Sequence, residues 1–147
     1  MDGLRWVQLP TDERDEFLGT GGIGVLSFST ELAEPPASLP VSYGYNADAG
    51  TLYFRLSFPP GTRKTDVVDD PVSFVSFDRT ADGWRSVVAT GHLDELADIP
   101  YDSEAVQGMW AVDIPTVDIF DRPREEISFQ DFRLDPETLT GRKEVPP

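Results

Sequence analysis

Residues 51–64 read Thr-Leu-Tyr-Phe-Arg-Leu-Ser-Phe-Pro-Pro-Gly-Thr-Arg-Lys, and this stretch decides the fold that we expect. Its first eight residues alternate as a β-strand does, and the Pro-Pro-Gly run then ends the strand. Thr62 is a residue type that caps the start of a helix, where free backbone amides favour an anion. Arg63 and Lys64 add two cations at the same point, which suits a phosphate group, although a solvated basic turn has the same sequence.

Two strand–turn–strand patterns organise the chain around this stretch. The first hairpin is expected at 41–45 and 52–57, and the second at 72–78 and 84–91 with an extension toward Leu93. Further strands are expected at 23–29 and 127–134, and short helices at 11–18, 65–70 and 102–110. Hairpin connections indicate an antiparallel sheet rather than a βαβ arrangement. We therefore predict a mainly β protein, a six-stranded antiparallel barrel with a few short helices.

The remaining segments carry weaker signals. Residues 31–40 contain three prolines and are predicted to be a surface loop. Residues 111–120 have β character that Pro115 interrupts, and residues 135–147 are predicted to be a polar, turn-rich C-terminal tail. With 147 residues and 39% hydrophobic content, residues 1–147 are expected to form a single domain with a true core.

The composition is strongly acidic. The chain has 27 Asp and Glu residues against 12 Lys and Arg, a formal charge of −15, and its only lysines are Lys64 and Lys143. A negative surface repels nucleic acids and anionic membranes, so a small-molecule ligand is favoured. Abundant acidic residues with few lysines also resemble proteins of high-salt cytoplasms. No apolar run reaches the roughly 20 residues that span a bilayer, and no signal-peptide pattern is present, so a cytoplasmic location is expected.

Several kinds of catalytic site are excluded by composition. The chain has no cysteine and a single histidine, His92, which rules out disulfides, zinc–thiolate sites and multi-histidine metal sites. His92 and Asp94 are the nearest approach to an acid–base pair, but they alternate with ordinary surface residues on an expected strand. Acidic runs such as Glu125-Glu126 are typical of a solvated face. We predict no metal site and no catalytic side chain.

Five short segments in order resemble the pyridoxamine 5′-phosphate oxidase-like proteins, the flavin-binding split barrels. The segments are residues 40–45, 52–54, 61–64, 70–72 and 84–91, within a match over about residues 13–97. The resemblance implies a six-stranded split β-barrel that dimerises side by side. It also implies an FMN cofactor held in the groove between the two subunits, with residues from both chains at the site.

The resemblance assigns the phosphate-binding turn and the strands that line the cofactor. Arg63 and Lys64 resemble the pair that binds the FMN phosphate, and Thr62 resembles its hydroxyl partner. The other implied contacts lie on three strands: Val41, Ser42 and Tyr43, then Phe54 and Arg55, then Trp84 and Ser86. For the aromatic residues among these, packing in the core is the alternative interpretation.

The sequence departs from the true oxidases in two places. Those enzymes read the substrate phosphate with a basic and aromatic C-terminal motif, whereas this chain has no histidine after His92, so oxidation of pyridoxamine 5′-phosphate is not expected. The loop between Ser57 and Thr62 is also longer. The expected function is thus an FMN-dependent oxidoreductase of unidentified substrate and electron partner, whose flavin performs the electron chemistry. A deazaflavin- or haem-binding relative and a non-catalytic flavin-binding protein remain alternatives.

Overall fold

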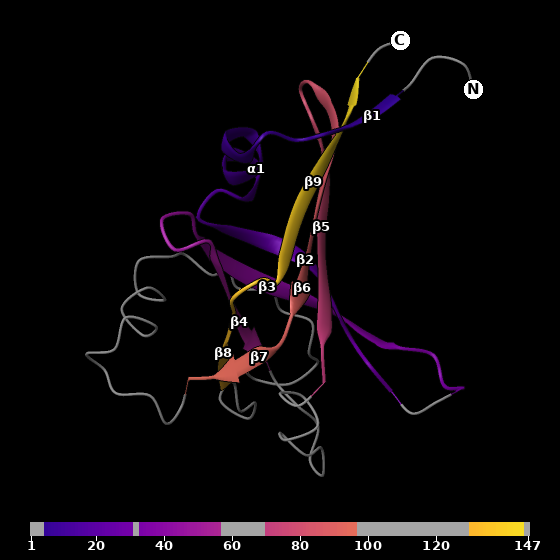
Figure 1. Ribbon diagram of the computed structural model, residues 1–147, viewed down its shortest axis with the longest axis vertical. Helices are drawn as coiled ribbons and strands as arrows, with labels where there is room; N and C mark the ends of the chain where they lie inside the picture. The colour runs from indigo at the N-terminus through magenta and orange to yellow at the C-terminus, as the bar shows by residue number, and fades with distance from the viewer. Residues whose placement is uncertain (1–4, 31–32, 57–69, 97–129, 146–147) are drawn as a thin grey trace, which may run out of the picture.

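The computed structural model describes residues 5–30, 33–56, 70–96 and 130–145. These residues form one short helix and nine strands (Figure 1). In chain order the elements are β1 (Arg5–Gln8), α1 (Thr11–Leu18), β2 (Gly21–Phe28), β3 (Ala37–Asn46), β4 (Thr51–Leu56), β5 (Val72–Thr80), β6 (Gly83–Gly91), β7 (Leu93–Glu95), β8 (Gln130–Leu134) and β9 (Thr138–Val145).

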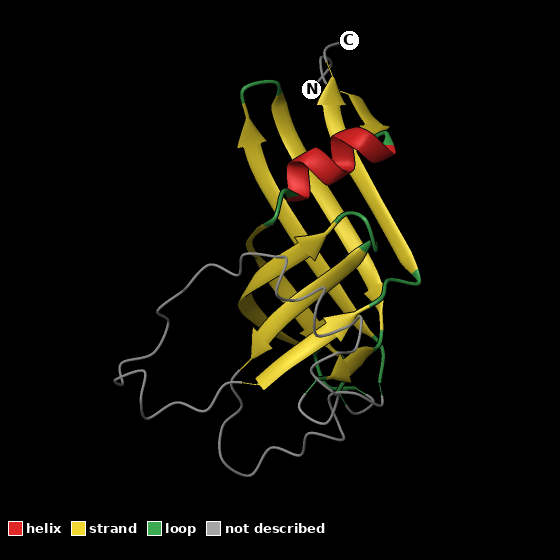
Figure 2. Cartoon of the chain, turned by 90° about the vertical axis from the view of Figure 1, so that its left-hand side faces the viewer, coloured by secondary structure: helices red, strands yellow, loops and turns green. Residues whose placement is uncertain are grey.

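All nine strands belong to one antiparallel sheet. Its order is β1-β9-β6-β5-β2-β3-β4-β8-β7, so strands that are neighbours in sequence are often separated in space. The sheet curls into a half-barrel, with helix α1 lying across its concave side (Figure 2). The predicted antiparallel barrel class is therefore confirmed, while the strand count differs from the six expected.

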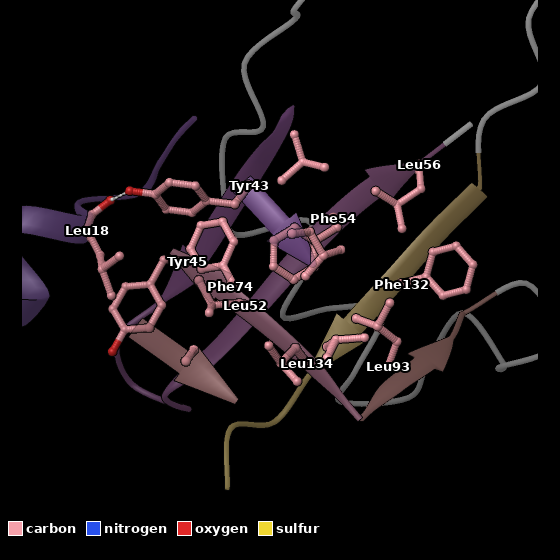
Figure 3. Packing of buried hydrophobic residues seen from close by; sticks show 14 of the residues in the cluster. Leu18, Tyr43, Tyr45, Leu52, Phe54, Leu56, Phe74, Leu93, Phe132 and Leu134 are labelled. Carbon is pink, nitrogen blue, oxygen red and sulfur yellow. Dashed lines mark hydrogen bonds between the residues drawn. The ribbon is translucent and has the colours of Figure 1, made fainter. Parts of the chain in front are cut away.

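The curl of the sheet is shown by aromatic contacts between distant strands. In the sheet order, β5 and β4 are three strand spacings apart, which is roughly 14 Å in a flat sheet. Yet the Phe74 ring centroid lies 5.1 Å from that of Phe54 and 5.2 Å from that of Tyr43 (Figure 3). All three side chains are at most 2% exposed. The rings can meet only because the sheet bends around them.

Glycine at position 24 makes room for this bend. A Cβ atom on Gly24 would lie 2.6 Å from both a ring carbon of Phe74 and the backbone oxygen of Val75. Such a contact is too close for any side chain, and one of its partners is backbone. The strand β2 therefore needs glycine at this position, because the Phe74 ring and the backbone of the neighbouring strand β5 lie against it.

Helix α1 is fixed to the sheet by two tyrosine hydroxyl groups. Tyr43 Oη donates to the backbone oxygen of Leu18 at 3.0 Å, and Tyr45 Oη donates to Asp15 Oδ1 at 2.6 Å. Arg14 forms an ion pair with the same Asp15 carboxylate at 3.2 Å. Burial, and then the Asp15 carboxylate, raise the pKa of Tyr45 to about 12. The helix thus covers the concave face through specific polar bonds as well as apolar contact.

The two predicted hairpins are confirmed as β3–β4 and β5–β6, and the helix at 11–18 is confirmed as α1. The strand predicted at 23–29 is β2, and residues 130–134 of the strand predicted at 127–134 form β8. The extension toward Leu93 forms β7. The helices predicted at 65–70 and 102–110 and the segment 111–120 lie outside the described residues, apart from Asp70.

The predicted polar tail at 135–147 is wrong for Thr138–Val145, which form β9. This strand lies inside the sheet, paired with β1 on one side and β6 on the other. Local composition concealed it, because its residues are mostly polar. Its stability comes from hydrogen bonding on both sides and from the close packing of Leu9 on Gly141.

The predicted loop at 31–40 is wrong for Ala37–Pro40, which begin β3. These residues pair with β2, whereas β4 pairs only with Tyr43–Asn46. Among the described residues, this half of β3 therefore has a sheet partner on one side only. A proline is accepted there because its missing amide removes no bond of the sheet.

Replacing Gly24 with Ala should destabilise the fold by about 1–3 kcal/mol, because β2 or Phe74 must move to accept the methyl group. The matched control is Gly22→Ala, whose Cβ would meet only the end of the Tyr43 side chain, at 3.0 Å. We expect a smaller loss for the control. Chemical denaturation measures both, and a Gly24→Ala protein as stable as the control would contradict the packing described here.

Replacing Tyr45 with Phe should cost about 1.5 kcal/mol, because the bond to Asp15 is lost. The pKa of Tyr45 is raised above its unfolded value of about 10. Its hydroxyl therefore stabilises the fold fully below pH 10 and loses this effect as the pH rises through 12. Denaturation measured between pH 8 and 12 should show a shallower alkaline decline in the variant; parallel declines would refute the assignment.

Candidate functional site

The curled sheet has two chemically different faces, because successive side chains of a strand point to opposite sides. The concave inner face holds the buried core, whereas the convex face is here called the outer face. Large exposed apolar side chains gather on the outer face: Trp6 at 56% exposure, Ile23 at 64%, Phe77 at 61% and Trp84 at 40%. An exposed apolar surface of this kind typically binds a ligand or another protein surface.

A line of paired residues crosses the outer face. Gln8 pairs with Arg142, Arg142 with Ser86, and Ser86 with Phe77, joining β1, β9, β6 and β5. Directly paired side chains in antiparallel strands are close neighbours, with Cβ atoms about 5 Å apart. This line therefore combines an amide, a guanidinium, a hydroxyl and an aromatic ring.

The same face continues onto β2 and β3. Val25 pairs with Val75, so Ile23 and Phe77, each two residues further along, lie on the same side as that pair. Ile23 in turn pairs with Ser42. The outer face thus extends from the chain's N-terminal strand to the first hairpin.

The structure places four of the predicted site residues on the outer side. They are Ser42 on β3, Arg55 on β4, and Trp84 and Ser86 on β6. Trp84 lies beside Phe77, with ring centroids 6.4 Å apart. Core packing, the alternative for Trp84, is not what the structure has, because its side chain is 40% exposed.

Two of these four residues are less accessible to a ligand, one because it is buried and the other because it forms an ion pair. Ser42 is only 8% exposed. The Arg55 Nε atom lies 2.9 Å from Asp131 Oδ1, on the paired position of β8. This partner already balances the charge of Arg55, so a ligand anion would compete with Asp131 for the guanidinium group.

Three other predicted site residues point into the core. Val41, Tyr43 and Phe54 are 7%, 2% and 0% exposed and belong to the inner-face cluster. Figure 3 shows Tyr43 and Phe54 within this cluster. Core packing, the alternative for Phe54, is therefore its role within this chain. The side chains of Val41 and Tyr43 face away from the outer side. Residues 37–42 of β3 pair with β2 and have no second sheet partner among the described residues, so the described sheet leaves the other edge of this backbone unpaired.

The predicted phosphate turn, Thr62, Arg63 and Lys64, lies outside the described residues. Within the described part of the chain, no group of three or more His, Cys, Asp or Glu side chains is arranged to hold a metal ion. No helix among those residues is long and apolar enough to cross a membrane.

Three buried tyrosines, Tyr43, Tyr45 and Tyr53, have raised pKa values. Burial raises the pKa of Tyr43, and the nearby Ser76 hydroxyl only partly offsets it. Burial also raises the pKa of Tyr53, against a smaller opposing effect of Arg133. With the pKa of Tyr45 also raised, these phenols stay protonated at neutral pH.

Sequence reasoning missed the contribution of β1 and β9 to the outer face. Trp6, Val7, Gln8, Thr140, Gly141 and Arg142 line a groove of about 410 Å³. Pockets of about 300–1,000 Å³ are typical of small-molecule sites. The signal was hidden because these residues are 130 or more positions apart in the chain and meet only through the β1–β9 pairing.

Comparison with solved structures finds the same fold in flavin-associated proteins. An FAD-binding protein from Mycobacterium smegmatis matches with a TM-score of 0.67 at 15% identity, over 95% of this chain and 99% of its own. An FAD-binding protein from Mesorhizobium loti matches with a TM-score of 0.65 at 22% identity, over 97% and 99%. An FAD- and haem-binding protein from M. smegmatis matches with a TM-score of 0.53 at 13% identity, over 97% and 83%. At these identities the likeness concerns the fold.

Comparison with curated protein sequences found no match. The family model described as pyridoxamine 5′-phosphate oxidase matches residues 10–143, from the residue before α1 to near the end of β9. This range includes both hairpins and most of the strands that form the outer face. Because the match spans nearly the whole chain and the fold agrees with it, the protein belongs to the pyridoxamine 5′-phosphate oxidase family.

Proposed function

We propose that the protein is a flavin-binding oxidoreductase that holds FMN against its outer face and acts on a small molecule. The observation that supports this most directly is that Ser42, Trp84 and Ser86, from distant parts of the sequence, share that face. The family membership and the FAD-binding proteins of the same fold favour a flavin over other cofactors.

The residues present fit a flavin ring. Ile23 and Phe77 offer apolar surface to a planar tricyclic group, and Ser86 offers a hydroxyl beside it. The open edge of β3 at residues 37–42 offers backbone amide and carbonyl groups, which suit the polar edge of an isoalloxazine ring.

In this proposal Thr62, Arg63 and Lys64 bind the FMN phosphate. When bound, the flavin supplies the electron-transfer chemistry, and the chain supplies binding, orientation and the local charge. Oxidation of pyridoxamine 5′-phosphate itself is not proposed. Of the two C-terminal cations, Lys143 is already held by Glu13, with its Nζ 3.0 Å from both carboxylate oxygens, so one cation remains where the true oxidases use a basic motif.

Haem is the second candidate, since one protein of the same fold binds FAD and haem and another binds haem. The chain has no cysteine, and its single histidine is His92. His92 lies eight residues beyond Trp84, roughly 26 Å along an extended strand, with its Nδ1 3.2 Å from Glu137 Oε1. Haem ligated by histidine at the outer face near Trp84 is therefore disfavoured. The visible spectrum of the purified protein separates flavin from haem and from deazaflavin.

Replacing both Arg63 and Lys64 with Ala should weaken FMN at least tenfold, because each charge-assisted bond to a phosphate contributes about 1.5–3 kcal/mol. Riboflavin has the same ring without the phosphate, so its affinity should change little. Fluorescence titration of both ligands measures the difference. Equal losses for FMN and riboflavin would refute phosphate binding by this turn.

We further propose a homodimer in which the outer faces of two chains meet and share the flavin site. Exposed Ile23, Phe77 and Trp84 need a partner surface, and a closed two-fold pair is its commonest source. Because each chain carries a formal charge of −15, salt should favour association by screening repulsion.

Sedimentation should therefore show a dimer in molar salt that dissociates, and loses flavin, as salt is removed. Phe77→Asp should shift the protein to monomer at every salt concentration, because it buries a charge in the contact. Ala47→Asp is the control, since it adds the same charge in the exposed β3–β4 turn. A native monomer that keeps bound flavin across the salt series would overturn the shared site.

A further inference from the structure

The groove between β1 and β9 carries an unusual set of side chains for so acidic a protein. Trp6, Gln8, Thr140 and Arg142 all point to the outer face, where Gln8 and Arg142 are a direct pair. The Trp6 ring is 56% exposed. An exposed indole ring, a guanidinium group and two neutral polar side chains surround a volume of about 410 Å³.

The charge of Arg142 is not balanced within the described part of the chain. Its neighbour Lys143 points to the other side of β9 and is held by Glu13. The next residue, Glu144, directs a carboxylate oxygen to the backbone amide of Trp84 at 3.3 Å. No carboxylate of the described residues lies within ion-pair distance of the Arg142 guanidinium, whereas Arg14, Arg55 and Arg133 have such a partner. Arg5, Arg79 and Arg85 also have no ion-pair partner among the described residues, but of these four arginines Arg142 is the one that lines the groove. Arg142 is thus open to a ligand anion.

We propose that this groove binds a small aromatic carboxylate. The planar ring stacks on Trp6, and the carboxylate accepts two hydrogen bonds from the Arg142 guanidinium. A single negative charge is favoured over a doubly charged phosphate, because one guanidinium faces the groove and the chain is strongly negative overall. Gln8 and Thr140 offer hydrogen bonds to further polar groups of the ring.

The interpretation of this groove as a substrate site rests on the proposed function. Arg142 pairs directly with Ser86, the residue proposed to lie beside the flavin. A carboxylate held by Arg142 would therefore lie at the rim of the cofactor site, and aromatic carboxylates become the substrate class.

Ligand-detected NMR titration of the native protein with benzoate tests the inference. We expect binding in the millimolar range, as befits so small a ligand, with benzyl alcohol binding at least tenfold more weakly. Phenyl phosphate should bind no more tightly than benzoate. Two results would overturn the proposal: no benzoate binding at about 20 mM, or benzyl alcohol binding as tightly as benzoate.

Variants locate the binding. Arg142→Gln should weaken benzoate about tenfold, and Trp6→Leu should weaken it as well. Arg79→Gln is the matched control, because Arg79 is an exposed arginine on the outer face that lies outside the groove. Arg142→Lys keeps the charge, so its affinity for benzoate should lie between those of the native protein and Arg142→Gln. It replaces Arg142→Gln in the comparison if that variant fails to fold. Equal losses at positions 142 and 79 would overturn the assignment.

The flavin spectrum of the same samples is an independent measurement. If the protein contains no flavin but binds benzoate through Arg142, the carboxylate site in the groove is supported and the proposed cofactor is refuted. A flavin-loaded protein that ignores benzoate would refute the groove and leave the proposed cofactor intact.

Discussion

The packing of the Phe74 ring against Tyr43 and Phe54 is the contact on which the rest of the structure depends. It joins β5 to strands that would lie well apart in a flat sheet. Gly24 permits the contact, because any larger residue would collide with both Phe74 and the β5 backbone. Once these rings meet, the sheet must curl, and the concave side becomes a closed apolar core capped by α1.

The curl also determines which residues remain for binding. The concave side uses the inward positions of every long strand, so aromatic residues such as Phe54 and Tyr43 are committed to stability. The alternate positions on β2, β5 and β6 stay on the convex side, where Ile23, Phe77 and Trp84 are exposed. An exposed apolar surface of this kind typically binds a ligand or another protein surface.

The sequence predicted the parts of the fold that depend on local signals. Both hairpins have turn residues between alternating strands, and α1 ends at glycine, so each could be assigned from a short window. Strand β9 could not, because Thr140, Arg142 and their neighbours gain β structure only from pairing with β1 and β6. The same difference applies to the site residues. Ser86 lies on a strand that the sequence predicts, whereas Arg142 lies in a segment whose composition predicts a polar tail. The inward direction of Tyr43 needed the register of the whole sheet.

The position of the Arg142 charge on the outer face connects the fold to the proposed function. In a chain of net charge −15, several cations are neutralised by a carboxylate within the described residues, as Arg55 is by Asp131 and Lys143 is by Glu13. Strand alternation places Arg142 on the side of β9 opposite to Lys143, and the Glu144 carboxylate turns to the β6 backbone instead. An unbalanced guanidinium lowers the free energy of an anion at that position through charge-assisted hydrogen bonds, and the exposed aromatic rings add surface on which a planar group can stack. The fold therefore places a positively charged group on the outer face, where it can attract an anion although the chain as a whole is negatively charged.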